Sequence, residues 1–426
     1  MKQINSFFQH VLLIGFFAIL PVYSYAAVDM QAHVVSDEGL AAYTAYNSKQ
    51  AAYYTGNYAY NVLVTKSGNE LFGVLNSLMG NTSDIGSSRF SYNSLRDEYV
   101  NVDRDLNTAG KIIGYYDGYV LSGTWGSGWN REHTWPQSKG AKSTIPMGHD
   151  MQSVRPTNTA VNSSRGNDAY GESSGYYDPN EVTINNKNYK TINLGTYRGD
   201  AARVILYDYV VYGEAGGYKN TLYNGNAQLL QKLGTEGVFE SLHVLLKWHM
   251  QDPPSLTEMV RNDGAQDYQG NRNPFIDYPE LAIEMLLNNS SVKAYEVTHS
   301  GADMQPAYAH TTAAGFIAYL TKQDGTHPQE SELKVTGGTY QYNAILGRLT
   351  ITKANGAVTI TVGDGSTALE DVEADGSNYA DEAIIFNAAG IKVAHTTQGA
   401  VNSVMQTLPH GLYIIRTPRM TTKVLR

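Results

Sequence analysis

The sequence predicts an α+β protein in which a mainly helical domain precedes a smaller domain of β-strands. Apolar residues recur at helical spacing in several segments before residue 290, whereas short alternating runs separated by glycine dominate after residue 333. A length of 426 residues allows two or three domains with real cores, and 42% hydrophobic with 17% charged residues is typical of globular proteins.

The N-terminus has the features of a signal peptide, which we place at residues 1–26. Lys2 precedes a short apolar run, VLLIGFFAIL at 11–20, and Ser-Tyr-Ala at 24–26 offers small residues for cleavage. This run is too short to span a bilayer comfortably, and no later run is long enough, although a short membrane anchor is the alternative. We therefore expect a secreted or cell-surface protein without stable membrane insertion.

The first domain is expected to cover residues 28–290. Its helices carry apolar stripes, a possible cap at Asp200 and a proline at an early helical position, Pro279. Helices are predicted over residues 68–79, 90–102, 199–210, 241–249, 256–263 and 279–287, with a strand over 111–119 and a hairpin over 185–195.

The rest of the chain is expected to form a linker with some β structure over 291–330 and a small β-sandwich over 331–426. Short strands with glycine turns predict the sandwich. These predicted strands cover residues 347–353, 357–362, 382–387, 390–394, 411–416 and 423–425.

Charge and cysteine content limit the functions that are possible. The net charge of −9 argues mildly against a nucleic-acid binder, but Asp364 to Glu382 contains seven carboxylates and no Lys or Arg, so a site elsewhere can stay cationic. The chain has no cysteine, which excludes disulfides, thiolate zinc sites and cysteine nucleophiles.

The residues that carry chemistry lie between 129 and 167. A neutral imidazole at His133 can take a proton from water, and the adjacent carboxylate of Glu132 can hold a hard divalent ion. Asn162 can add a carboxamide oxygen from a following helix. This set is suited to cutting a phosphodiester with a metal ion.

One geometric condition applies to the Glu132–His133 pair. Adjacent residues on a regular strand point to opposite faces, so both can serve one site only if the strand ends or bends there. Pro136, three residues later, makes such an ending plausible. Otherwise the pair belongs to a solvated strand edge.

Four cations flank the site as candidate phosphate binders, with surface solvation as the alternative for each: Lys139, Lys142, Arg155 and Arg165. His149 and Asp150 form a competing polar pair. With His133 they could make a zinc site, although a structural role for Asp150 is favoured.

Taken together, these segments resemble the endonuclease I family of bacterial nucleases. The matching segments are WNREHTWPQS (129–138), DMQSVRPTNTAVNSSRGN (150–167), GDAARVILYDYVVYG (199–213), LLKWHMQDPP (245–254) and YQGNRNPFIDYPE (268–280). The resemblance implies a ββα-metal site with His133 as general base and Glu132 and Asn162 as Mg²⁺ ligands. It also implies hydrolysis of DNA, RNA or both with little sequence preference, usually leaving 5′-phosphates. Gln152-Ser153 departs from the pattern, because family members often have His-His or His-Asn there.

The tail resembles the C-terminal sorting domain of the type IX secretion system. The segments that carry this resemblance are AIIFNAAGIKVAHTT (383–397), LPHGLYIIRT (408–417) and TTKVLR (421–426). It implies export across the outer membrane, with the secretion machinery as a partner.

The sequence thus predicts a secreted, Mg²⁺-dependent, sequence-nonspecific nuclease that acts on DNA or RNA as a monomer. Ca²⁺ or Mn²⁺ are possible substitutes for Mg²⁺. His133, Arg155 and Arg165 are the expected catalytic residues, and Glu132 and Asn162 the expected metal ligands. The rivals are a catalytically weak nucleic-acid-binding or surface protein on the same scaffold, and an adhesin whose β tail carries the function.

Overall fold

The structure is a computed structural model. It describes residues 37–80, 91–167, 169–170, 177–184, 187–192, 197–212, 214–215, 218–219, 242–363, 382–387, 392–408, 412–416 and 421–425. The predicted signal peptide, residues 1–26, lies outside them. The chain divides into two compact units, Met1–Val362 and Gly363–Arg426.

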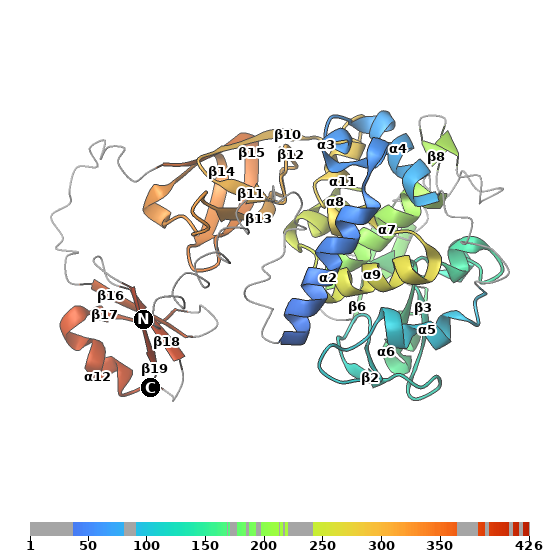
Figure 1. The fold of residues 1–426 in the computed structure, drawn as a ribbon, viewed down its shortest axis with the longest axis horizontal. Helices are drawn as coiled ribbons and strands as arrows, with labels where there is room; N and C mark the ends of the chain where they lie inside the picture. The colour runs from blue at the N-terminus through green and yellow to red at the C-terminus, as the bar shows by residue number, and fades with distance from the viewer. Residues whose placement is uncertain are drawn as a thin grey trace, which may run out of the picture. The chain divides into compact units, whose positions relative to one another are not determined.

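Helices and strands occur in successive groups along the described chain (Figure 1). The helices are α2 (Asp37–Tyr53), α3 (Tyr60–Leu63), α4 (Gly68–Gly80), α5 (Leu95–Val102), α6 (Thr159–Arg165), α7 (Arg198–Tyr212), α8 (Leu242–Gln251), α9 (Leu256–Gln269), α10 (Pro274–Asp277), α11 (Leu281–Leu286) and α12 (Val401–Met405). The strands of the first half are β1 (Lys111–Ile113), β2 (Val120–Ser122), β3 (Trp129–His133), β4 (Val154–Asn158), β5 (Ala169–Tyr170), β6 (Tyr177–Ile184), β7 (Lys187–Ile192), β8 (Glu214–Ala215) and β9 (Tyr218–Lys219). Those of the second half are β10 (Tyr295–Ser300), β11 (Asp303–Gln305), β12 (His310–Thr311), β13 (Phe316–Thr321), β14 (Leu333–Asn343), β15 (Arg348–Val362), β16 (Glu382–Asn387), β17 (Lys392–Thr397), β18 (Leu412–Arg416) and β19 (Thr421–Leu425).

This mixture confirms the predicted α+β class. Within the described chain, no helix combines the length and the apolar character that crossing a membrane would require.

Helix α9 runs six residues past its predicted end, Asp263. Ser255 and Glu258 form a capping box at its start, and Gly270 ends it with a φ of 89°. The extension, residues 264–269, is partly buried although it is polar: Gln269 is 1% exposed and donates to Asp150 Oδ1 at 2.7 Å, whereas Asp267 is exposed. Just before the extension, the buried Asp263 lies 2.7 Å from Arg272. A hydrophobic pattern cannot reveal a helix face that is stabilised by ion pairs.

Residues 291–330, expected as a linker with some β structure, supply four strands of a six-stranded sheet. Strand β10 pairs in parallel with β15, with Val297 opposite Val358, and β13 pairs antiparallel with β15. The boundary between the two units therefore falls after Val362, not near residue 331. The partner strand lies about sixty residues away in the sequence, so local composition could not reveal the pairing.

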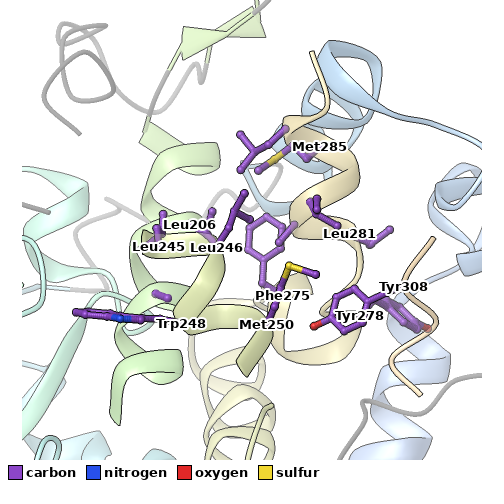
Figure 2. Close-up of a cluster of buried hydrophobic side chains, with 14 of the residues drawn as sticks. Leu206, Leu245, Leu246, Trp248, Met250, Phe275, Tyr278, Leu281, Met285 and Tyr308 are labelled. Atoms are coloured by element: carbon purple, nitrogen blue, oxygen red, sulfur yellow. The ribbon is translucent and has the colours of Figure 1, made fainter. Parts of the chain in front are cut away.

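One hydrophobic core joins the helices to this sheet. Figure 2 shows Phe275 packed among side chains from α8 and α11, with Tyr278 and Tyr308 nearby. Leu245, Phe275 and Leu281 have no exposed surface. Burying each contributes about 1.5–3 kcal/mol. Gln251 of α8 also donates to the Ala314 carbonyl oxygen, 2.5 Å away. The six-stranded sheet is thus part of the first unit's fold.

The second unit contains one four-stranded antiparallel sheet in the order β17-β16-β18-β19. Met405 and Val401 of α12 pack against Ile385 and Ile415 of this sheet. Among its described residues the apolar face of the sheet is covered by this short helix, rather than by the second sheet of the expected sandwich.

Candidate active site

The candidate site is built on a two-stranded ribbon followed by a helix. Strands β3 and β4 pair antiparallel, with Glu132 opposite Arg155 and His133 opposite Val154. Asn158 then caps α6 by accepting a hydrogen bond from the Ala160 N–H, 2.9 Å away. Figure 1 shows β3, α5 and α6 grouped at one end of the first unit. Strand β3 ends at His133, as the position of Pro136 predicts.

The side chains of β3 alternate between two environments. Glu132 contacts Tyr116 and Arg165, whereas Arg131 and His133 both lie against Tyr92. We call the Glu132 side the inner face and the Arg131–His133 side the aromatic face. The two predicted catalytic neighbours therefore have different surroundings, although both stand at the end of the strand.

Glu132 is 2% exposed and its carboxylate is fixed at one oxygen. Oε1 accepts from the Tyr116 hydroxyl at 2.6 Å and from Arg165 at 2.8 Å. Burial raises the pKa of Glu132, while the charge of Arg165 and the Tyr116 hydrogen bond oppose that rise. Oε2 accepts no hydrogen bond from any residue that the structure describes.

Asn162 presents its amide in a similar way. Its Nδ2 donates to Asn130 Oδ1 at 2.7 Å and to the Arg131 carbonyl oxygen at 3.1 Å. The Arg131 carbonyl directly precedes Glu132, so the amide of Asn162 lies next to the backbone of that residue. Both hydrogens are used, and the carbonyl oxygen Oδ1 has no partner in the described chain.

Glu132 Oε2 and Asn162 Oδ1 are oxygen donors of the kind that a hard divalent cation takes. Mg²⁺ prefers oxygen ligands and keeps several of its waters, so one or two protein oxygens suffice. A zinc site made of His133, His149 and Asp150 is not supported, because no three His, Cys, Asp or Glu side chains gather in the described part of the chain.

His133 is 6% exposed, and its ring lies 5.3 Å from the Tyr92 ring. Neither ring nitrogen makes a hydrogen bond of ordinary geometry with a described residue. An interaction with the Ala141 backbone raises the pKa of the ring, but it is the smallest of the contributions. Burial lowers the pKa of His133 to about 4, helped by the charges of Arg131 and Arg165. The imidazole is therefore neutral near pH 7, with nitrogen lone-pair capacity that no described residue uses.

Comparison with known proteins identifies the scaffold that carries this geometry. The family model described as endonuclease I matches residues 82–280, which contain every predicted site residue. The extracellular ribonuclease of Bacillus amyloliquefaciens is 33% identical over 237 residues, which cover 52% of this chain and 75% of that protein. The extracellular ribonuclease of Bacillus subtilis (strain 168) is 31% identical with the same coverage. This chain belongs to the endonuclease I family.

In this endonuclease I family nuclease, Arg165 is 1% exposed and ties α6 to the end of β3. Besides Glu132, it donates to the carbonyl oxygens of His133 and Thr134, at 2.9 and 3.0 Å. Its guanidinium also lies 4.9 Å from the Tyr170 ring centroid. These contacts favour a positioning role over the direct phosphate contact that the sequence suggested.

Arg155 is placed similarly, at 5% exposure. Its Nε lies 3.4 Å from Asp103 Oδ1, an ion pair without a well-formed hydrogen bond, and its guanidinium lies 4.4 Å from the Tyr115 ring centroid. Its burial and these contacts favour a structural role over the phosphate contact that the sequence suggested. Lys142 is exposed, and the side chain of Lys139 lies outside the described part.

Asp150 has a structural role in this family member, as expected. Its carboxylate accepts from Tyr207, Tyr212, Gln269 and the Gln152 N–H. All four donors are protein groups, so the carboxylate uses its hydrogen-bonding capacity within the fold.

Gln152 and Ser153, where the family pattern often has His, are buried and hydrogen-bonded to neighbouring elements. Gln152 donates to Asn262 at 2.9 Å, and Ser153 donates to Asp208. Burial raises the pKa of Asp208 well above its usual range, while the Ser153 hydrogen bond opposes this. The polar contacts of this turn thus hold the start of β4 in place without histidine.

Tyr116 is a site residue that the sequence analysis missed. The expected strand over 111–119 stops at Ile113, and Tyr116 follows in a turn with a φ of 77°. Left-handed backbone is unusual for a non-glycine residue and is often retained where a side chain must be aimed. Here it places the hydroxyl on Glu132. Gly114 and the Asp117-Gly118 pair were the local signals of such a turn.

Proposed function

We propose that this protein is a secreted, Mg²⁺-dependent nuclease that hydrolyses phosphodiester bonds of DNA or RNA with little sequence preference. The observation that carries the proposal is a neutral His133, whose ring nitrogens make no well-formed hydrogen bond with a described residue, next in sequence to Glu132. Glu132 and Asn162 each keep one oxygen without a hydrogen-bond partner among the described residues. The endonuclease I family membership and the two extracellular ribonucleases support the same reaction class.

The proposed mechanism uses His133 as general base. The imidazole accepts a proton from a water molecule as that water attacks phosphorus, and the P–O3′ bond breaks to leave a 5′-phosphate. The 3′ oxygen takes its proton from solvent. A nearby phosphate charge raises the pKa of the ring, which strengthens His133 as a base once substrate is bound.

Glu132 and Asn162 are the residues that would hold the cation, which supplies charge neutralisation at the phosphate. Tyr116 and Arg165 fix Glu132 Oε1, and the Asn130 side chain with the Arg131 carbonyl fixes the Asn162 amide. Both ligand oxygens are therefore preorganised before metal binds, which reduces the ordering cost of binding.

A digestion series tests this proposal. Plasmid, single-stranded DNA and RNA are each incubated with Mg²⁺, Ca²⁺, Zn²⁺ or EDTA. We expect cleavage with Mg²⁺, none with EDTA, and about a 10²–10⁴-fold loss in the His133→Ala variant. Binding without any wild-type hydrolysis would instead support the rival, a catalytically weak nucleic-acid-binding protein.

We further propose that residues 363–426 act in type IX secretion and not in catalysis. A chain that ends after Val362 keeps the core shared by the helices and the six-stranded sheet, so it should cut as well as the full protein. If the tail instead carried the function as an adhesin, this deletion would abolish adhesion. Deletion from residue 291 removes buried strands and should destabilise the first unit, which makes it an unsuitable test.

We expect the active protein to be a monomer.

A further inference from the structure

A cation and two aromatic rings meet on the aromatic face of β3 beside His133. The Arg131 guanidinium carbon lies 3.5 Å from the Tyr92 ring centroid and 4.7 Å from that of Trp125. Trp125 is 37% exposed. A cation over two ring faces is attracted to both, which holds the guanidinium in one orientation. We call Tyr92, Trp125 and Arg131 the aromatic platform.

Trp125 stands on a loop that the fold holds in place. The indole N–H of Trp129 donates to the carbonyl oxygens of Ser122 and Thr124, at 2.7 and 3.1 Å. The Trp125 ring packs edge-on against Trp129, with 5.1 Å between centroids. Trp129 itself is 2% exposed, so the loop is anchored to a buried side chain. The exposed indole is thus positioned rather than loose.

Arg131 differs from the buried arginines of the first unit in having no carboxylate partner among the described residues. It donates to the Tyr92 carbonyl oxygen, and a second contact with Asn93 Oδ1 is long at 3.5 Å. Arg155 and Arg165, by contrast, each face a carboxylate. A preorganised guanidinium without an anion suits a phosphate group, which it can bind through two N–H donors.

We propose that the aromatic platform is a nucleotide subsite for single-stranded substrate. Trp125 stacks on an unpaired base, and Arg131 binds a phosphate of the same strand. Base stacking on an exposed aromatic ring tolerates any sequence, in keeping with a nonspecific nuclease. A base in a duplex is already stacked on both faces and must leave its helix to reach Trp125, so single strands are preferred. This inference rests on the proposed nuclease function.

The test measures kcat/KM for a fluorescent oligonucleotide as a single strand and as the duplex with its complement, in Mg²⁺. Trp125→Ala is compared with Trp125→Phe, which keeps a stacking ring, and with Tyr340→Ala. Tyr340 serves as a matched control. Its side chain is 36% exposed, close to the 37% of Trp125, but it lies on β14 in the six-stranded sheet. Thermal unfolding checks that each variant folds.

We expect Trp125→Ala to lower kcat/KM about tenfold for the single strand and less than twofold for the duplex. Trp125→Phe should recover most of the loss, and Tyr340→Ala should change neither value. Equal losses on both substrates, or no loss on either, would overturn the inference while leaving the nuclease function intact. A wild-type protein that cuts neither substrate would instead reject the proposed function itself.

Discussion

The two faces of β3 use the same residue type for different tasks. On the inner face, Arg165 is 1% exposed and neutralises Glu132. On the aromatic face, Arg131 is half-buried between two rings and has no carboxylate partner among the described residues. The inner arginine therefore fixes Glu132, the proposed metal ligand, whereas the outer one remains available to an anion. Arginines within the segment 129–167 cannot be assumed to share a role.

The largest expected effect comes from breaking the inner face. Arg165→Met leaves the Glu132 carboxylate buried without its counter-charge, which should lower the free energy of unfolding by about 3–5 kcal/mol. Urea unfolding measures this. The double variant Glu132→Gln with Arg165→Met should recover part of the loss, since it removes the uncompensated charge. A loss below about 1 kcal/mol would show that the pair contributes little.

The second-largest expected effect is stabilisation by Mg²⁺, which should depend on Asn162 and not on His133 of the aromatic face. Mg²⁺ at about a hundred times its Kd should stabilise the wild-type protein by about 2.7 kcal/mol, because only the folded state presents Glu132 and Asn162 together. Asn162→Ala should lose most of this stabilisation, and His133→Gln should keep it. Thermal unfolding with and without Mg²⁺ provides the readout. Equal responses in both variants would contradict the assignment of the metal to the inner face.

A smaller effect is expected from the outer arginine. Arg131→Met removes a phosphate contact but no ion pair, so KM should rise about tenfold, while the free energy of unfolding changes by about 1 kcal/mol or less. Steady-state kinetics and urea unfolding on the same preparation separate the two quantities. A stability loss as large as that of Arg165→Met would remove the distinction between the faces.

The smallest expected effect belongs to Tyr116. Tyr116→Phe keeps the ring and the backbone conformation but deletes one donor to Glu132 Oε1, which Arg165 still contacts. We expect a loss of about 1 kcal/mol in the free energy of unfolding. Tyr119→Phe is the control, because Tyr119 is 64% exposed. If both variants behave alike in urea unfolding, the Tyr116 hydroxyl does not support the site.

Local sequence predicted the parts of the site that depend on neighbouring residues. Strand β3 ends at His133 before Pro136, and Asn162 lies on a helix that directly follows β4. The positions of Arg155 and Arg165 could not be predicted in this way. Their burial depends on Asp103, Tyr170 and Glu132, which reach them only through folding.

The sequence by itself determined the α+β class and the endonuclease I resemblance, and it supplied the residues that we propose for the chemistry. Side-chain chemistry and short-range periodicity are properties of the chain and survive without a fold. The tertiary structure decided which cation is buried and which stays open, and it turned the expected linker into strands β10–β13. Those outcomes depend on partners far away in the sequence, such as β15 for β10, and on the cost of burying a charge without a counter-charge.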